Sequence, residues 1–246
     1  MLLLHTLGGT GALWRPVVDE LADDCELVVP DLPGFGRSPE LPSGTPATAA
    51  NLAGAVVELC EELGVERPHV AGISLGGWVA LELAKAGAVR SALAISPAGM
   101  WRDPLGARRF ERQRLGRLLW PIARGALATR RGREALLQSN FARPERVPKA
   151  DAREIVEGYL TAPGYPAASL AMRTGAFEHE GRVSVPVTVV WGERDRIVGR
   201  PSRRRLPPGV GYSAMPGWGH VPTWDDPRGV ADLVRSSDAG RQASPR

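Results

Sequence analysis

Short apolar runs alternate with segments of helical spacing along most of this chain, and this alternation limits its possible folds more than any other feature. Runs that end in glycine, proline or polar turns predict strands at residues 2–5, 26–30, 69–73, 89–96, 185–191 and 210–215. Apolar residues three or four positions apart predict helices at residues 13–22, 48–63, 75–86 and 227–235, with a short helix at 200–206. Because alternating strands and helices build a parallel sheet covered on both faces, we expect a doubly wound, mostly parallel α/β fold.

The alternation stops between residues 99 and 178, where no clear strand is found. Apolar residues at helical spacing in this segment form a stripe of Phe110, Leu115, Leu118, Leu119 and Ile122. The segment is therefore predicted to be a helical cap inserted into the α/β domain. The expected division is 1–98 for the first part of the core, 99–178 for the cap, 179–236 for the second part of the core, and 237–246 for a disordered tail.

The composition excludes several classes of protein. Two cysteines in 246 residues provide neither a disulfide scaffold nor a cysteine-ligated zinc site. No apolar run approaches the roughly 20 residues needed to cross a bilayer, and residues 1–5 lack the flanks of a secretory signal. The few histidines do not cluster with carboxylates, and residues 8–11 lack the Gly-Lys-Ser/Thr of a phosphate loop. We expect a soluble, cytoplasmic protein with no cofactor and no metal.

The positive charge of the chain is concentrated in one segment. The net charge of +4 and the pI of about 9.6 are compatible with a nucleic-acid partner. However, residues 101–150 hold 13 Lys and Arg against four Asp and Glu, whereas the rest of the chain holds 18 against 23. Since no nucleic-acid motif accompanies this charge, we expect an arginine-coated, solvated outer face on the cap and no nucleic-acid partner. A preference for acidic substrates or an acidic protein partner is the alternative.

The segment Gly72-Ile-Ser-Leu-Gly76 lies between a predicted strand and a predicted helix. A strained turn of this kind lifts a serine clear of the sheet, and glycines are needed two residues to either side because larger residues would clash. The spacing therefore predicts Ser74 as a nucleophile. The first amides of the following helix would point at the reacting atoms.

A serine hydroxyl needs a base, and the chain has four histidines. His220 follows the last predicted strand in a Gly-Trp-Gly-His turn, so it is the preferred base. His69 begins a strand at the far end of the sheet, which indicates a structural role. His5 lies near the active edge, directly before a glycine-rich loop. His179 ends the inserted segment, where a solvated surface side chain is expected.

The imidazole needs a carboxylate to orient it and to stabilise its charged form. Asp195 comes just after a buried strand. The chain order Ser74, Asp195, His220 is the order expected when a nucleophilic serine lies at a strand-to-helix elbow of an α/β sheet. Glu193 and Asp103 are the alternatives. Glu193 lies nearer the strand, and Asp103 lies several residues beyond the strand at residues 89–96.

Backbone amides are expected to stabilise the oxyanion that develops during acyl transfer. One donor is the Leu75 N–H, at the start of the helix that follows Ser74. The second comes from the loop after the first strand, and Leu7 is the preferred residue. Gly8 and Gly9 allow this loop to approach a substrate closely.

Taken together, these motifs resemble the α/β-hydrolase superfamily, in its cap-bearing serine hydrolase branch. The matching segments are spread over nearly the whole chain in the expected order: His5-Thr-Leu-Gly-Gly9, Asp31-Leu-Pro-Gly-Phe-Gly-Arg-Ser38, Gly72-Ile-Ser-Leu-Gly-Gly77, Trp191-Gly-Glu-Arg-Asp195 and Gly219-His-Val-Pro-Thr-Trp-Asp-Asp-Pro227. The resemblance implies a helical cap after the sixth strand of the family, which matches residues 99–178.

Two departures from the family pattern affect these expectations. Thr6 stands where the family usually has glycine, so the loop that carries the second oxyanion donor is expected to differ. The two strands that usually precede the His5 strand also have no counterpart, so either the start codon is misassigned or the protein lacks them. Residues 26–30 would then form a sheet edge, and an exposed apolar edge favours pairing with another chain. Poor solubility or a homodimer through this edge is therefore expected.

A serine at the elbow argues against haloalkane dehalogenases and epoxide hydrolases, whose relatives use carboxylate nucleophiles. The leading hypothesis is hydrolysis of a carboxylic ester or lactone through an acyl-enzyme on Ser74. The alternatives are a carbon–carbon bond hydrolase or thioesterase with the same triad, and a non-catalytic small-molecule-binding protein on the same fold. The cap stripe faces the pocket or packs on the core. Further candidates for the substrate pocket are Met100, Trp101, Trp218 and Val221.

Overall fold

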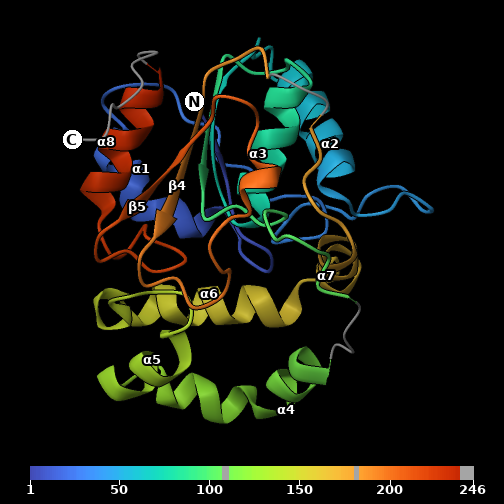
Figure 1. Ribbon diagram of the computed structural model, residues 1–246. Helices are drawn as coiled ribbons and strands as arrows, with labels where there is room; N and C mark the ends of the chain where they lie inside the picture. Colours follow the sequence, from blue (N-terminus) through green and yellow to red (C-terminus); the bar gives the residue numbers. More distant parts are fainter. Residues whose placement is uncertain (107–110, 180–182, 239–246) are drawn as a thin grey trace.

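The computed structural model describes residues 1–106, 111–179 and 183–238 (Figure 1). Its centre is a five-stranded sheet in which every pairing is parallel and the strands lie in chain order. The strands are β1 (Leu2–Leu4), β2 (His69–Ile73), β3 (Ser91–Ile95), β4 (Val187–Gly192) and β5 (Tyr212–Met215). β2 and β3 are almost entirely buried, as expected of strands that helices cover on both faces. The predicted α/β class with a mostly parallel sheet is confirmed.

The predicted strand at residues 26–30 is reduced to one isolated parallel bridge between Val28 and Leu2. The Leu3 N–H donates to Val28 O and the Val28 N–H donates to Met1 O, so this segment lies outside β1. The chain thus runs outward from β1 to Val28 and then returns to β2 on the other side of β1. Loops that leave parallel strands at such a reversal diverge and open a crevice at the carboxyl ends. Dimerisation through the Val28 edge stays a prediction.

Helices cover both faces of the sheet (Figure 1). The 3₁₀ turn η1 (Gly11–Trp14), α1 (Arg15–Leu21) and α8 (Pro227–Asp238) lie on one face, and α2 (Ala49–Glu62) and α3 (Leu75–Lys85) lie on the other. The short helix predicted at residues 200–206 is the 3₁₀ turn η3 (Arg203–Arg205). α8 reaches Asp238 with Ser237 buried, so residues 237 and 238 do not belong to the disordered tail predicted for 237–246. Residues 239–246 lie outside the described part of the chain.

In the described part of the segment between β3 and β4, four α-helices lie across the carboxyl ends of the strands (Figure 1). They are α4 (Glu111–Ala126), α5 (Arg130–Leu137), α6 (Lys149–Thr161) and α7 (Tyr165–Thr174), with the 3₁₀ turn η2 (Pro144–Arg146) between α5 and α6. We call residues 111–174 the lid. They fall within the predicted cap, whose boundaries at 99 and 178 stay a prediction. Phe110 lies outside the described residues.

The apolar stripe of α4 is not placed as expected. Leu115, Leu118 and Ile122 are 55%, 76% and 72% exposed, and Leu119 is 44% exposed while also contacting the cavity described below. The stripe therefore does not pack on the core. The spacing of apolar residues predicts that a helix has an apolar face. Whether that face points toward the core or toward solvent depends on which side of the helix contacts the rest of the protein.

Among the described residues, no helix combines the length and the hydropathy needed to cross a bilayer.

Candidate active site

Ser74 lies at the sharp turn between β2 and α3, with φ +56° and ψ −113°. This backbone conformation is strained for a residue with a Cβ, and such strain is typical of functional positions. Packing enforces the flanking glycines, as the sequence predicted. A Cβ on Gly72 would overlap the carbonyl oxygen of Gly76, and a Cβ on Gly76 would lie 2.6 Å from His5 O. Ser74 is only 5% exposed, which places its hydroxyl in a site sheltered from bulk water.

Asp195 lies in the loop after β4 and His220 lies in the loop after β5, so the two side chains meet beyond the carboxyl ends of these strands. His220 Nδ1 lies 2.8 Å from Asp195 Oδ2, and both side chains are almost fully buried. The second oxygen of Asp195 accepts hydrogen bonds from the Ile197 and Val198 N–H groups, at 2.8 and 3.0 Å. These bonds fix the carboxylate, which in turn fixes the orientation of the imidazole.

The pKa of Asp195 is lower than that of an ordinary aspartate. Burial by itself raises this pKa, but the hydrogen bond and charge of His220 and the two backbone N–H donors outweigh it. Asp195 is therefore ionised at neutral pH. The alternative acids do not occupy this position, since Glu193 is exposed and the Asp103 side chain is 85% exposed.

The His5 side chain is fully buried and both of its ring nitrogens have partners. Nδ1 lies 2.8 Å from Thr6 O, and the Leu32 N–H donates to Nε2 at 2.8 Å. This pairing makes Nδ1 the protonated nitrogen of a neutral ring. Burial lowers the pKa of His5 to about 4, although the bond to Thr6 and the charge of Asp31 act in the other direction. His5 therefore holds the loop after β1 in place, and it is not a free base. His69 contacts Ser91 Oγ at the opposite end of the sheet.

Two backbone amides at the site are available to an oxyanion. Within the described part of the chain, no hydrogen bond has the Leu7 or the Leu75 N–H as its donor. Leu75 begins α3, whose dipole adds partial positive charge at this end. Thr6 O accepts from the Gly9 N–H and from the His5 ring, so Thr6 is tied into the loop that carries Leu7. Whether both amides bind an oxyanion stays a prediction.

Ser74 and His220 line one cavity of about 490 Å³ between the sheet and the lid. Leu7, Thr6 and Val221 line it from the sheet side. The lid contributes a larger set of mostly apolar side chains: Leu119, Ala123, Leu136, Leu137, Phe141, Ile155, Val156, Tyr159, Leu160, Tyr165 and Met172. No Asp, Glu, Lys or Arg is found among the described residues that line it. The cavity therefore suits an uncharged, apolar group.

Three of the four predicted pocket residues are not part of this lining. Met100 is fully buried in the core beside α3. Trp101 packs edge-on against Trp78 and donates its ring N–H to Gly175 O at 2.8 Å. Trp218 is buried and donates its ring N–H to Asp226 at 3.0 Å. Only Val221 lies where it was predicted, because it directly follows His220.

The sequence did not single out Asp225, which joins the His220 loop to the lid. Its carboxylate accepts from the Gly219, Ala142 and Arg143 N–H groups, at 2.8, 3.0 and 2.7 Å. Burial raises the pKa of this carboxyl, and the three N–H donors oppose the shift. The neighbouring Asp226 accepts from the Gly229 N–H in the first turn of α8. The long-range role of Asp225 has no local signal.

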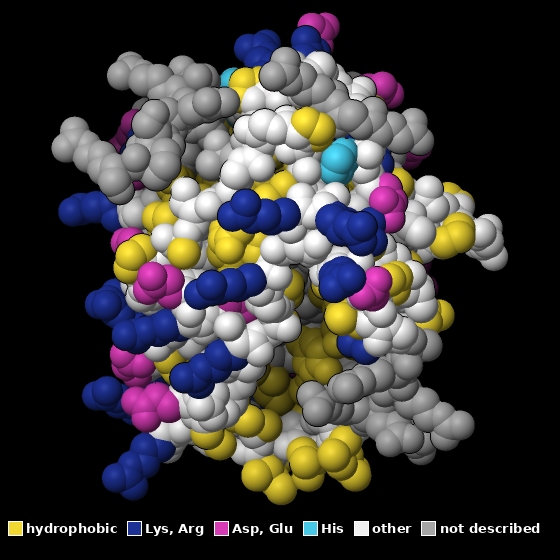
Figure 2. Space-filling model, in the orientation of Figure 1, with side chains coloured by type: hydrophobic (Ala, Val, Ile, Leu, Met, Phe, Trp, Pro, Cys, Tyr) yellow, Lys and Arg dark blue, Asp and Glu magenta, His cyan; other side chains and the backbone are white. Residues whose placement is uncertain are grey.

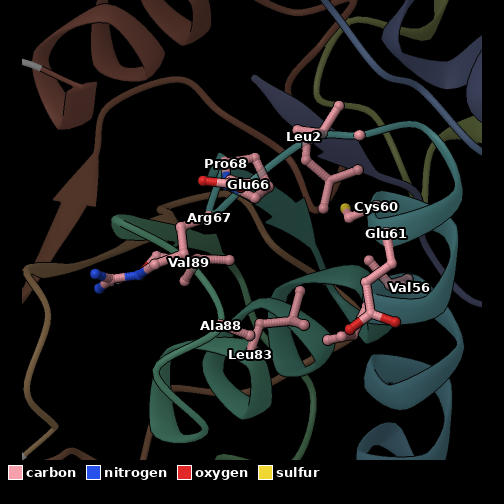
Figure 3. Close-up of a pocket in the computed structure, with 13 residues that line it drawn as sticks. Leu2, Val56, Cys60, Glu61, Glu66, Arg67, Pro68, Leu83, Ala88 and Val89 are labelled. Atoms are coloured by element: carbon pink, nitrogen blue, oxygen red, sulfur yellow. Dashed lines mark hydrogen bonds between the residues drawn. The ribbon is translucent and has the colours of Figure 1, made fainter.

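A second cavity, of about 520 Å³, lies at the amino ends of the strands (Figure 3). Its lining includes Leu2, Val56, Cys60 and Val89, and Figure 3 shows Arg67 extending away from its centre. Burial raises the pKa of the Cys60 thiol, which keeps it protonated and a weak nucleophile. No predicted catalytic residue lies there. The described residues also contain no cluster of three or more His, Cys, Asp or Glu able to hold a metal ion.

Comparisons with known proteins agree with this geometry. A model of the alpha/beta hydrolase family matches residues 1–233. The epoxide hydrolase EphH of Mycobacterium tuberculosis is 32% identical over 202 residues, which is 77% of this chain and 94% of that protein. The pimeloyl-[acyl-carrier protein] methyl ester esterase of Aeromonas hydrophila is 37% identical over 110 residues, 42% of this chain and 40% of that protein.

Among solved structures, a thermophilic esterase from Thermogutta terrifontis is 25% identical. The match has a TM-score of 0.66 and covers 96% of this chain and 87% of the esterase. The family match spans the strands, the elbow and the loop that carries His220. The chain therefore belongs to the alpha/beta hydrolase family.

Proposed function

We propose that the chain is a serine hydrolase that cleaves a carboxylic ester or lactone with an apolar acyl group. The observation that carries this proposal is the 490 Å³ cavity, which both Ser74 and His220 line and whose described lining residues include no Asp, Glu, Lys or Arg. An uncharged apolar substrate loses little hydration free energy there, whereas a charged substrate would be desolvated without a partner. The chemistry is assigned to Ser74, Asp195 and His220.

In the proposed reaction, Ser74 Oγ attacks the carbonyl carbon while His220 Nε2 takes its proton. The ionised Asp195 holds Nδ1–H and stabilises the imidazolium that forms. The Leu7 and Leu75 N–H groups donate to the oxyanion. His220 then gives the proton to the leaving alkoxide, the carbon–oxygen bond breaks, and an acyl-enzyme remains. Water, deprotonated by His220, attacks this ester and releases the acid and Ser74.

Labelling with a fluorophosphonate tests the nucleophile. The parent protein is expected to be labelled, and Ser74→Ala, which removes only the hydroxyl, is expected not to be. Labelling that is equal in both proteins, or absent from both, would contradict the assignment of Ser74.

Substrate class is tested with p-nitrophenyl esters. Butyrate and octanoate esters are expected to turn over at least about tenfold faster, in kcat/KM, than the hemisuccinate, because the carboxylate of the hemisuccinate would be buried without a partner. Equal rates would contradict the apolar substrate. Ser74-dependent turnover of diketones or acyl thioesters with no ester turnover would favour the alternative carbon–carbon hydrolase or thioesterase.

The similarity to EphH raises epoxide hydrolysis as a competing function. Ser74 argues against it, since the epoxide hydrolases that this fold resembles use a carboxylate nucleophile. Hydrolysis of styrene oxide by the parent protein, retained in Ser74→Ala, would favour the competing function and reject the ester assignment.

We also propose that the ester hydrolase acts in the cytoplasm.

A further inference from the structure

The lid presents an apolar surface outward, which we call the lid face: Leu115, Leu118, Leu119 and Ile122 on α4 with Leu136 on α5. Their exposed fractions range from 42% for Leu136 to 76% for Leu118. Figure 2 shows hydrophobic side chains gathered along the lower edge of the molecule, where Figure 1 places α4. Exposed apolar patches of this kind mark interaction surfaces on proteins, because leaving them in water costs free energy.

The orientation of α4 is fixed by contacts on its opposite side. Gln113 is buried, and its side-chain amide donates to Tyr159 O at 2.8 Å. Arg117 donates from Nε to Leu160 O at 2.5 Å. At Gly116 the two helices come so close that a Cβ would lie 2.6 Å from a methyl group of Leu160. These contacts anchor α4 to α6 and direct the leucines away from the molecule.

Exposed arginines outnumber acidic residues beside the lid face. Arg124, Arg130 and Arg131 are exposed on α4 and α5, and Glu134 of α5 pairs with Arg130 at 2.8 Å. The wider segment 101–150 carries 13 Lys and Arg against four Asp and Glu. A helix with leucine and isoleucine on one side and arginines beside them is the pattern of helices that lie in the surface of an anionic bilayer. The same charges disfavour a second copy of this chain as the occupant, because two arginine-rich faces would repel each other.

The lid face is continuous with the cavity at Ser74. Leu119 and Leu136 belong to both surfaces, since each is partly exposed and each lines the cavity. An apolar molecule would therefore move from a bilayer into the cavity along aliphatic side chains. This continuity favours a lipid surface over a folded protein partner.

We propose that the lid face docks on the surface of an anionic phospholipid bilayer. Leu118 and Ile122 enter the acyl boundary, and the nearby arginines contact lipid phosphates. This interaction goes beyond the proposed ester hydrolysis, and it is measured as binding, without turnover.

The test is flotation of the full-length Ser74→Ala protein with vesicles, in which no lipid is hydrolysed through Ser74. With vesicles of equal phosphatidylglycerol and phosphatidylcholine, the protein is expected in the floating fraction, and with phosphatidylcholine alone it is expected to stay largely below. Leu118→Gln combined with Ile122→Gln is expected to lower the partition coefficient by about tenfold or more. High salt is expected to lower it as well, because it screens the arginines.

Leu63→Gln is the matched control for Leu118→Gln. Leu63 is 54% exposed at the end of α2, in the sheet domain away from the lid (Figure 1). Its variant is expected to float as well as the parent. The double variant with Ser74 intact is expected to keep its melting temperature and its turnover of a water-dissolved ester, since neither Leu118 nor Ile122 lines the cavity.

Absence of the Ser74→Ala protein from the vesicle fraction would overturn the docking proposal. Equal flotation of this protein with and without the Leu118→Gln and Ile122→Gln changes would overturn it as well. Light scattering tests whether a second copy of this chain occupies the lid face instead. A protein that is dimeric, binds no vesicles and becomes monomeric when Leu118 and Ile122 are both replaced by Gln would assign the lid face to that second copy. If the parent floats but hydrolyses no ester, the docking stands and only the proposed function fails.

Discussion

The loops at the carboxyl ends of the strands and the lid face each other across one cavity, but they are built on different principles. In the loops, fixed backbone geometry positions each functional group: Ser74 at φ +56°, and Asp195 by two N–H donors. In the lid, a few side chain-to-backbone bonds hold helices whose apolar residues are divided between cavity, core and solvent. The proposed chemistry thus depends on the fixed loops, whereas most of the apolar lining of the cavity comes from the lid.

The comparison also separates two uses of glycine. Gly76 lies where backbone carbonyls of β1 and its following loop approach α3, whereas a Cβ on Gly125 in α4 would have no atom of the described residues within 4 Å. One glycine is required by packing and the other is not. The four predictions below, from the largest expected effect to the smallest, test whether the two regions differ in this way.

Replacing Asp195 by Asn keeps the shape of the side chain and removes its charge. We expect kcat for a p-nitrophenyl ester to fall by about 10⁴-fold, because the imidazolium loses its stabilising partner and the ring its tautomer. The melting temperature is expected to change little in comparison. Steady-state kinetics with a thermal melt measures both. A fall of less than tenfold would mean that Asp195 has no part in the reaction.

Gly76→Ala is expected to destabilise the protein by about 4 kcal/mol or to prevent folding, because its Cβ would press on the Leu4 and His5 carbonyls. Urea unfolding followed by circular dichroism gives the free energy of unfolding. A loss below about 1 kcal/mol would show that the elbow relaxes easily, and would remove the contrast between the loops and the lid.

His5 is expected to make the loop region sensitive to acid. Its pKa is about 4 in the folded protein and 6.5 in an unfolded chain, so the unfolded state binds a proton at a higher pH. Stability is therefore present above pH 6.5 and is lost as the pH falls toward 4, by about 3 kcal/mol in total.

His5→Gln removes this titration. Urea unfolding at several pH values is expected to give a variant that is less stable than the parent at pH 8, with a gap that narrows between pH 6.5 and 4. A gap that stays constant over this range would contradict the role of His5 as a buried neutral ring.

Gly125→Ala is the counterpart of Gly76→Ala in the lid. The new methyl group meets no atom of the described residues, and alanine favours the helix, so we expect stabilisation of about 0.5–1 kcal/mol. Turnover is expected to stay at the parental value. A clear destabilisation would mean that α4 is packed as tightly as the elbow.

Much of the fold follows from local pattern. The predicted helix at residues 75–86 is α3 (Leu75–Lys85), and the predicted strand at 69–73 is β2 without change. The strand predicted at 26–30 is wrong in extent, because the segment pairs with the sheet only through the bridge between Val28 and Leu2. Its apolar composition could not reveal how many neighbours it would have.

Local sequence patterns alone predict most elements of the α/β core, their order, and the positions of Ser74, Asp195 and His220 just after strands. These features depend on backbone geometry and on periodicity, which are local properties of a chain. Long-range contacts in the folded chain place Trp101 against Trp78 and bury Trp218. They also tie the lid to the His220 loop through Asp225, and they turn the leucines of α4 outward. Each of these depends on contacts between residues far apart in the chain, and a local pattern does not specify which surfaces will meet.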